Sequence, residues 1–418
     1  MALKRVEKWR RSAGVRPALR LIELGVVTAG VVAVAIALHG VDLLIVVVAI
    51  IVMVMLHEFG HFATAKLSGM KVTEYFLGFG PRLWSVRFGE TEYGVKAIPA
   101  GGYVKIVGMN NLDKVDSADE GRAYRSKPFH SRVIVAAAGS AMHVVMAFVL
   151  LWVLVAFMGV PSGRGAQISA LARSARGVDP AAVAGLRAGD VIVSVDGRRI
   201  GSVNAVVAAV TKRAGRRTSI VVKRDGRERT FEVTPETVKV GGENVGRIGI
   251  ELGSVIERSG PFSGLGIAGI DLGRVIALSG AALGSLFSLH GITGYVQDLT
   301  STRAANSAAR SGNRPESIYG AVVTASQAAK AGIGDLLVVL VSLNIFVGMI
   351  NLVPMLPLDG GHVVIACYER LRSRRGRPYR ADVQKLLPAT YFVLLLLGGI
   401  FLSSLYLDLA HPVVNPFR

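Results

Sequence analysis

The chain has 418 residues, a formal net charge of +19 and a mean hydropathy of +0.48. Charged residues make up 18%, which is too few for an ordinary water-soluble protein. Basic residues beside membrane helices explain the positive charge, because they bind anionic lipid, and no nucleic-acid-binding signature accompanies it. The composition therefore predicts a membrane protein without a nucleic-acid partner. The single cysteine, Cys367, excludes a disulfide framework and a cysteine-rich metal site.

Several stretches are apolar enough to cross a hydrocarbon layer of about 30 Å, which takes about 20 helical residues. They are residues 21–38, 42–67, 133–160, 334–356 and 388–407. The first stretch favours an uncleaved anchor over a signal peptide, because a long basic segment precedes it and its cleavage signal is weak. A further apolar stretch, residues 270–289, contains Asp271 and Arg274 and is interpreted as an interfacial helix.

The distribution of basic residues predicts the orientation. Lysine and arginine dominate the first twenty residues, whereas the short loop after the first helix has none. Because cytoplasmic loops carry the basic excess, we expect the N-terminus and the basic loop 370–385 in the cytoplasm. Residues 161–333 would then lie outside. The expected location is the plasma membrane, in a multi-pass arrangement.

The segment His57-Glu58-Phe59-Gly60-His61 has the HExxH pattern. Residues four apart share a face of a helix, so both imidazoles can bind one Zn²⁺, with Glu58 placed as the general base. The motif ends the apolar run 43–56, and ionisable side chains at membrane depth are unfavourable unless they have a function. The alternative is a polar helix end hydrated at the interface.

A catalytic zinc ion usually has three protein ligands. We expect the third to be Asp359, within the segment NLVPMLPLDGGH at residues 351–362. Pro354 and Pro357 must interrupt the helix there, and irregular backbone at membrane depth is tolerated where it lines a cavity. The predicted topology also brings both motifs towards the cytoplasmic ends of two inward helices. His362 is the rival ligand.

The two motifs together resemble the site-2 protease family of intramembrane metalloproteases, peptidase family M50, and its bacterial branch with an extracytoplasmic PDZ domain. The resemblance covers residues 40–408. It implies zinc on His57, His61 and Asp359, with Glu58 activating water. It further implies that Asn351, with Asn344, holds an unwound substrate helix; helix packing is the alternative for both asparagines.

The resemblance also implies the fold and the reaction. The fold would be a polytopic α-helical membrane protein with about five transmembrane helices, cleaving transmembrane segments after a first cut by another protease. Single-pass anti-sigma factors and signal-peptide remnants are the expected substrates. The chain departs from the family in its third helix, where Gly139-Ser140-Ala141-Met142-His143 stands in place of Gly-Pro-x-x-Asn.

Residues 76–80 and 93–107 alternate as short strands with glycine-rich turns do. In the family this region is a membrane-associated β-hairpin, where a substrate strand can be added beside the active site. Gly101 and Gly102 are therefore candidate substrate-binding positions. A soluble cytoplasmic hairpin remains the alternative.

Residues 184–200 resemble the PDZ signature AGL-x-x-GD-x-I-x-x-VDG. A helix at 203–213 and strands at 218–224 and 229–235, joined by the turn Asp225-Gly226, are predicted after it. The PDZ domain would bind a peptide or a trimmed C-terminus, either to filter substrates or to recruit them.

The predicted order along the chain is a basic tail with an extra helix, a first part of the membrane core, the PDZ domain, an interfacial helix with a linker, and a second part of the core. Their bounds are 1–39, 40–160, 164–256, 257–333 and 334–418. Within the fourth part, residues 301–314 are expected to be a flexible connection.

Two other functions compete with the protease. One is a catalytically silent membrane adaptor that presents the PDZ domain. The other is a metal transporter, which the absence of paired inverted repeats disfavours. The combination of His57, Glu58, His61 and Asp359 favours the protease.

Overall fold

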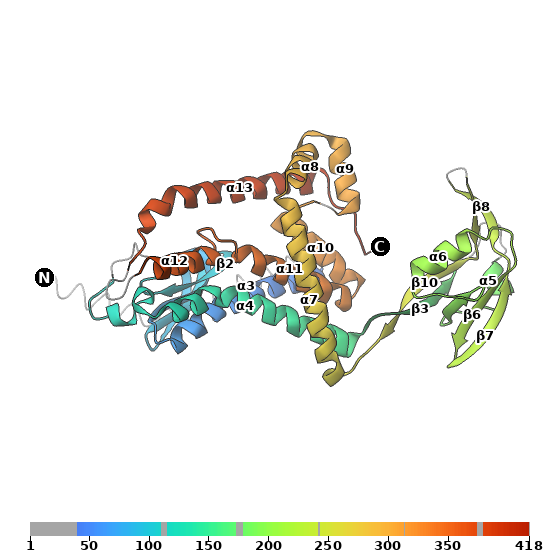
Figure 1. Ribbon diagram of the computed structural model, residues 1–418, viewed down its shortest axis with the longest axis horizontal. Helices are drawn as coiled ribbons and strands as arrows, with labels where there is room; N and C mark the ends of the chain where they lie inside the picture. The colour runs from blue at the N-terminus through green and yellow to red at the C-terminus, as the bar shows by residue number, and fades with distance from the viewer. Residues whose placement is uncertain are drawn as a thin grey trace. The chain divides into compact units, whose positions relative to one another are not determined.

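The computed structural model describes residues 40–109, 115–172, 179–240, 243–312, 314–373 and 379–417. They form two compact units, each of which is a separate body (Figure 1). The helical unit comprises the described parts of residues 1–152 and 268–418, and the β unit comprises those of residues 153–267. The first predicted helix, with its basic tail, lies outside the described residues.

Long helices build the helical unit. Their bounds are α3 Val41–Leu67, α4 Phe129–Val153, α7 Pro261–Leu286, α11 Ile333–Asn351, α12 Asp359–Arg372 and α13 Leu387–Ala410. Five helices of the described residues are long and apolar enough to cross a membrane: α3, α4 with its π-helical extension Leu154–Met158, α7, α11, and α13 with the turn before it. The chain is therefore a multi-pass membrane protein, as its composition predicted.

Four of these helices confirm predicted stretches, with shifted ends. Helix α11 ends at Asn351, before the predicted 356, because Pro354 and Pro357 follow. Helix α7 is the fifth, and it is one continuous helix of 26 residues rather than a short segment starting at residue 270. Whether α7 crosses the membrane or lies in its interface is therefore a question of topology rather than of helix length.

The expected flexible connection at residues 301–314 is wrong. Residues Thr302–Ser311 form helix α9, between α8 (Leu289–Thr300) and α10 (Ile318–Ala331). The Ser301 side chain caps its start by accepting from the Ala304 N–H, and Gly312 ends it in the left-handed conformation. The alanines between these caps favour the helix, so composition alone misled the prediction.

Strands β1 (Val72–Phe88) and β2 (Thr91–Ile106) are long and bent, not short as predicted. Residues 74–77 pair on one side with residues 102–105 and on the other with residues 92–95, and residues 85–88 pair with residues 91–94. Two strands thus make four pairing segments, of which residues 102–105 form an outer edge. Gly78, with φ of 86°, lies at the bend of β1.

The β unit has a sheet of order β10-β3-β4-β6-β7, with β5 paired to β4. The bounds are β3 Val160–Leu171, α5 Pro180–Val183, β4 Val191–Val195, β5 Arg198–Arg199, α6 Val203–Thr211, β6 Thr218–Arg224, β7 Arg227–Val233, β8 Glu236–Val240, β9 Glu243–Arg247 and β10 Ile250–Glu257. The predicted helix and hairpin are confirmed. Asp225 and Gly226 both have positive φ, as a two-residue hairpin turn requires.

One end of the helical unit is an apolar cluster that joins four helices. Val46 near the start of α3, Leu150 near the end of α4, Leu336 near the start of α11 and Ala325 of α10 belong to it. The end of α4 also packs, through its last turns, against the first half of α7 at Ala268. Helices α3, α4, α7, α10 and α11 therefore meet at this end.

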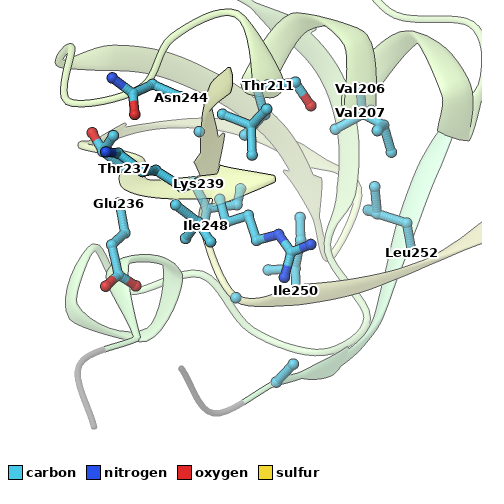
Figure 2. Close-up of a pocket in the computed structure, with 17 residues that line it drawn as sticks. Val206, Val207, Thr211, Glu236, Thr237, Lys239, Asn244, Ile248, Ile250 and Leu252 are labelled. Carbon is cyan, nitrogen blue, oxygen red and sulfur yellow. The ribbon is translucent and has the colours of Figure 1, made fainter. Parts of the chain in front are cut away.

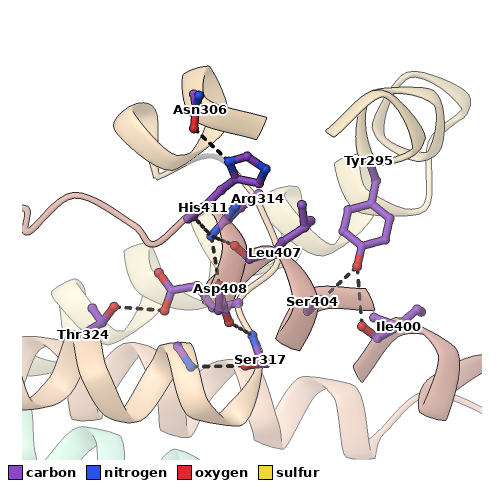
Figure 3. A network of polar contacts seen from close by, with 12 residues as sticks. Tyr295, Asn306, Arg314, Ser317, Thr324, Ile400, Ser404, Leu407, Asp408 and His411 are labelled. Carbon is purple, nitrogen blue, oxygen red and sulfur yellow. Dashed lines mark hydrogen bonds and ion pairs between the residues drawn. The ribbon is translucent and has the colours of Figure 1, made fainter. Parts of the chain in front are cut away.

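The C-terminal clamp is a polar network that fastens the end of α13 to the segment before α10 (Figure 3). The buried Arg314 guanidinium pairs with Asp408 at 3.1 Å and donates to the carbonyl of His411 at 2.6 Å. The other oxygen of Asp408 accepts from the Ser317 N–H at 2.8 Å. The side chains of Arg314 and Asp408 are almost fully buried, so each depends on the other.

We expect Asp408→Leu to destabilise the protein, because removing one member of a buried ion pair costs about 3–5 kcal/mol. The melting temperature of the purified protein measures the effect. Arg310→Ala changes an exposed cation on α9 and should leave that temperature unchanged. An Asp408→Leu protein that melts with the parent would show that the clamp does not stabilise α13.

Candidate metal centre

Two histidines and one aspartate meet inside the helical unit. His57 and His61 lie one turn apart on α3, and Asp359 is the first residue of α12. The two Nε2 atoms are 3.3 Å apart, and Asp359 Oδ2 lies 3.5 Å from that of His57 and 3.3 Å from that of His61. They form a potential metal-binding group among the described residues, and His362 is not part of it.

These distances fit a zinc ion. A tetrahedron with ligand atoms about 2.0–2.1 Å from its centre has edges of about 3.3–3.4 Å. Asp359 Oδ2 is buried and makes no hydrogen bond of normal geometry with any described residue. A single proton could satisfy only one of the three contacts, whereas a cation at the centre satisfies all of them. The donor set, two imidazoles and a carboxylate, is one that zinc prefers.

Tight backbone packing positions Asp359. The chain leaves α11 at Asn351, turns through residues 352–358, and enters α12. A Cβ at Gly360 would lie 2.2 Å from the Leu352 carbonyl oxygen, and one at Gly361 would lie 2.6 Å from the Leu356 nitrogen. Only glycine allows the loop to fold over the first turn of α12. The carboxylate thus stands at a helix N-terminus, where negative charge is favoured.

Helix α4 supports the two histidines from behind. A Cβ at Gly60 would lie 2.6 Å from the Ala138 carbonyl oxygen, and one at Gly139 would lie 2.4 Å from His61 Nε2 and 2.6 Å from His57 Nε2. The two helices therefore touch through glycines, directly beside the metal-facing nitrogens. His61 Nδ1 donates to the Val135 carbonyl at 2.7 Å, which fixes that ring.

Glu58 lies between the metal group and the β-sheet. A Cβ at Gly102 would come within 3.0 Å of Glu58 Cγ, so the edge segment of β2 passes directly over this side chain. The Tyr75 hydroxyl donates to the Met55 carbonyl at 2.7 Å and fastens the sheet to α3. Burial raises the pKa of Tyr75 to about 12, so the hydroxyl keeps its proton. Gly101, beside Gly102, faces the Phe79 ring.

The two candidate asparagines differ. Asn351 ends α11, half-buried, and its side chain makes no hydrogen bond to another described residue. The amide of Asn344 is engaged at both atoms: Nδ2 donates to the Leu340 carbonyl at 2.8 Å, and Oδ1 lies 3.0 Å from His143 Nδ1. From the sequence, His143 was expected near the site, as a hydrogen-bonding or packing residue and not as a ligand. Its spacing of four residues after Gly139 puts both on one face of α4.

A group of two histidines and an aspartate that could hold a metal ion, next to a glutamate and among membrane helices, has the composition of a metallohydrolase site. The profile of Peptidase family M50 matches residues 45–398, and the chain belongs to this family. It is similar to the zinc metalloprotease Rip1 of Mycobacterium tuberculosis, with 36% identity over 87% of this chain and 96% of the relative.

Two further relatives agree. The zinc metalloprotease Rip1 of Mycolicibacterium smegmatis is 33% identical over 90% of this chain and 99% of its own length. A putative zinc metalloprotease of Nostoc sp. is 29% identical over 84% of this chain and 92% of its own. The chain is thus an intramembrane zinc metalloprotease with Zn²⁺ as cofactor and membrane proteins as substrates. The resemblance seen in the motifs is confirmed, and the adaptor and the transporter are disfavoured.

We expect Gly139→Ala to lower zinc binding strongly, because the new methyl group would overlap both metal-facing nitrogens. Zinc per protein molecule, measured by elemental analysis after purification, tests this. Gly273→Ala is the matched control, since a Cβ at this helical glycine meets no other atom within 4 Å. Full zinc content in Gly139→Ala would mean that the metal lies elsewhere.

Proposed function

We propose that His57, His61 and Asp359 hold the zinc ion and that Glu58 is the general base for peptide hydrolysis. The observation that carries this proposal is the set of three ligand-to-ligand distances, 3.3, 3.3 and 3.5 Å. When bound, zinc supplies Lewis-acid chemistry: it polarises a carbonyl and makes water more acidic. Glu58 accepts the proton of the attacking water and returns it to the leaving amine nitrogen.

The substrate backbone must be extended when it is cut, because a helical peptide bond is shielded by its own hydrogen bonds. Each backbone group freed in hydrocarbon costs several kcal/mol unless it finds a new partner. The outer edge at residues 102–105 runs beside Glu58 and pairs with no further described strand, so a substrate strand can be added there. Asn351 offers an amide that has no partner among the described residues. We propose that these two features hold the substrate.

We further propose that the chain enters and leaves the α7–α10 segment on one side of the membrane. Ala268 of α7 packs at the end of α4, and Ala325 of α10 packs at the same end of the bundle. The helices that follow α7 are short: α8 has 12 residues, α9 has 10 and α10 has 14. Their lengths of about 15–21 Å are too short for a second crossing.

If α7 crossed the membrane completely, no helix from α8 to α10 would be long enough to bring the chain back to the first side. Helix α7 would instead enter the bilayer obliquely from one side, as the interfacial interpretation of residues 270–289 predicted. With α7 not counted as a crossing, the remaining helices give the orientation that the charge distribution predicts. The basic loop 370–385 is then in the cytoplasm, and the β unit is outside the plasma membrane.

We propose that the β unit is a PDZ domain that binds peptide ends. Strand β10 forms an edge of its sheet, and a groove of about 1050 Å³ lies between β10 and α6 (Figure 2). Val206 and Val207 of α6 and Ile250 of β10 supply apolar walls, which suit a peptide added as a strand. Lys239 and Glu236 also line this groove, and the positive charge of Lys239 suits a free carboxylate.

The substrates we propose are single-pass membrane proteins already cut by another protease, such as anti-sigma factors or signal-peptide remnants. A peptide end at the groove of the β unit would report that first cut. In this role the β unit either admits trimmed substrates or recruits them. Both roles require the new peptide terminus that the first cut creates.

The catalytic assignment predicts different losses for two variants. Glu58→Gln should keep zinc at the parental level and lower cleavage of a transmembrane substrate by at least about 10²-fold, the usual contribution of a general base. Asp359→Ala should lose both zinc and cleavage. Zinc content and gel-based cleavage in detergent measure both effects. Full zinc occupancy in Asp359→Ala would overturn the ligand set and direct attention to His362.

The topology predicts which positions are accessible from outside the cell. In a chain carrying Cys367→Ser, Thr230→Cys on the β unit should react with a membrane-impermeant thiol reagent in intact cells. Ser117→Cys, between β2 and α4, should react only after the membrane is opened. Both side chains are exposed, so burial cannot explain a difference. The reverse pattern would contradict the proposed orientation.

A further inference from the structure

His143 lies one turn beyond Gly139 on α4, on the face that supports the metal centre. Its side chain is buried, and its ring centroid lies 5.0 Å from that of His57, with the ring planes inclined by 43°. On its other side α11 passes closely, because a Cβ at Gly348 would lie 2.9 Å from the Cβ of His143. His143 therefore fills the junction of α3, α4 and α11.

A chain of hydrogen bonds fixes the His143 ring. Asn344 Nδ2 donates to the Leu340 carbonyl within α11, so Asn344 Oδ1 is the atom that faces His143. An amide oxygen only accepts hydrogen bonds, so the proton of the contact belongs to His143 Nδ1. The backbone of α11 thus sets the orientation of Asn344, and Asn344 sets the tautomer and plane of the imidazole.

His57 is held less firmly through its second ring nitrogen than His61. Metal-binding histidines usually donate their second ring nitrogen to a carbonyl or carboxylate, and this bond orients the ring. His61 does so through the Val135 carbonyl. His57 Nδ1 is buried, and although the Gly139 backbone interacts with this side chain, Nδ1 has no hydrogen bond of normal geometry among the described residues. Its ring is instead packed against the rings of His61 and His143 and the backbone of Gly139.

We propose that His143 is a positioning residue that holds the His57 imidazole in its metal-facing orientation by ring packing, and that Asn344 serves to fix His143. The inference rests on the proposed ligand set. It gives Asn344 a structural task in place of substrate binding and leaves Asn351 as the substrate-facing amide. It also gives a role to the residue by which this chain departs from the family pattern, since the asparagine usual there has no ring to pack against His57.

The experiment is a chelator competition on the purified zinc protein, with the visible spectrum of the cobalt-substituted protein as a second readout of ligand geometry. We expect His143→Ala to lower zinc affinity about 10–100-fold, as for other residues that orient metal ligands, and to change the cobalt spectrum. The double variant His143→Phe with Asn344→Leu keeps an aromatic ring and removes the unpaired amide. It should recover most of the affinity.

His130→Ala, at an exposed histidine of the same helix, is the matched control and should equal the parent. His61→Ala tests the ligand set separately from the role of His143, because parental zinc affinity in this variant would refute the ligand set itself. If His61→Ala loses zinc but His143→Ala keeps parental affinity and spectrum, the role of His143 is refuted alone. A double variant as weak as His143→Ala would also refute it, since ring packing would then not be what positions His57.

Discussion

The structure depends on holding two histidines and an aspartate together at membrane depth, where none of them would be favourable alone. Imidazole nitrogens and a carboxylate in an apolar environment need partners, and here they face one another. A zinc ion bound between them would turn three unsatisfied contacts into three ligand bonds. The surrounding helices must therefore approach more closely than ordinary side chains permit, and they do so at glycines.

That constraint explains features far apart in the sequence. Gly60 and Gly139 let α3 and α4 touch behind the histidines, and Gly360 and Gly361 let the loop after α11 fold over α12. The sheet that covers Glu58 has its own close contact at Gly102. At Gly60, Gly360 and Gly361 the missing side chain makes room for backbone, whereas at Gly139 and Gly102 it makes room for the side chains of the two histidines and of Glu58. The metal centre is thus a product of backbone packing as much as of its ligands.

The sequence predicted the candidate site residues better than it predicted the secondary structure around them. The HExxH spacing and the interrupted helix before Asp359 are local patterns that identified the candidate residues, and the predicted topology with the family resemblance indicated that they meet. The β1–β2 sheet was predicted only as short strands, since its four-segment pairing depends on bends that alternation does not reveal. Helix α9 was missed because small polar residues resemble a linker unless the caps at Ser301 and Gly312 are recognised.

The partners of the asparagines also lay beyond sequence reasoning. Asn344 and Asn351 are seven residues apart on α11 and look equivalent as polar groups in a membrane helix. Only the packing of α4 against α11 distinguishes them, because it brings His143 to one and leaves the other without a partner among the described residues. Contacts between helices distant in the chain decide such roles, and no local pattern encodes them.

X-ray absorption at the zinc edge of the purified protein tests the central claim most directly. The account predicts nitrogen and oxygen ligands at about 2.0–2.1 Å, with the scattering of two imidazoles and no sulfur. Asp359→Ala should remove this signal together with the metal. A third imidazole, or a sulfur ligand from Cys367, would contradict the proposed centre of His57, His61 and Asp359.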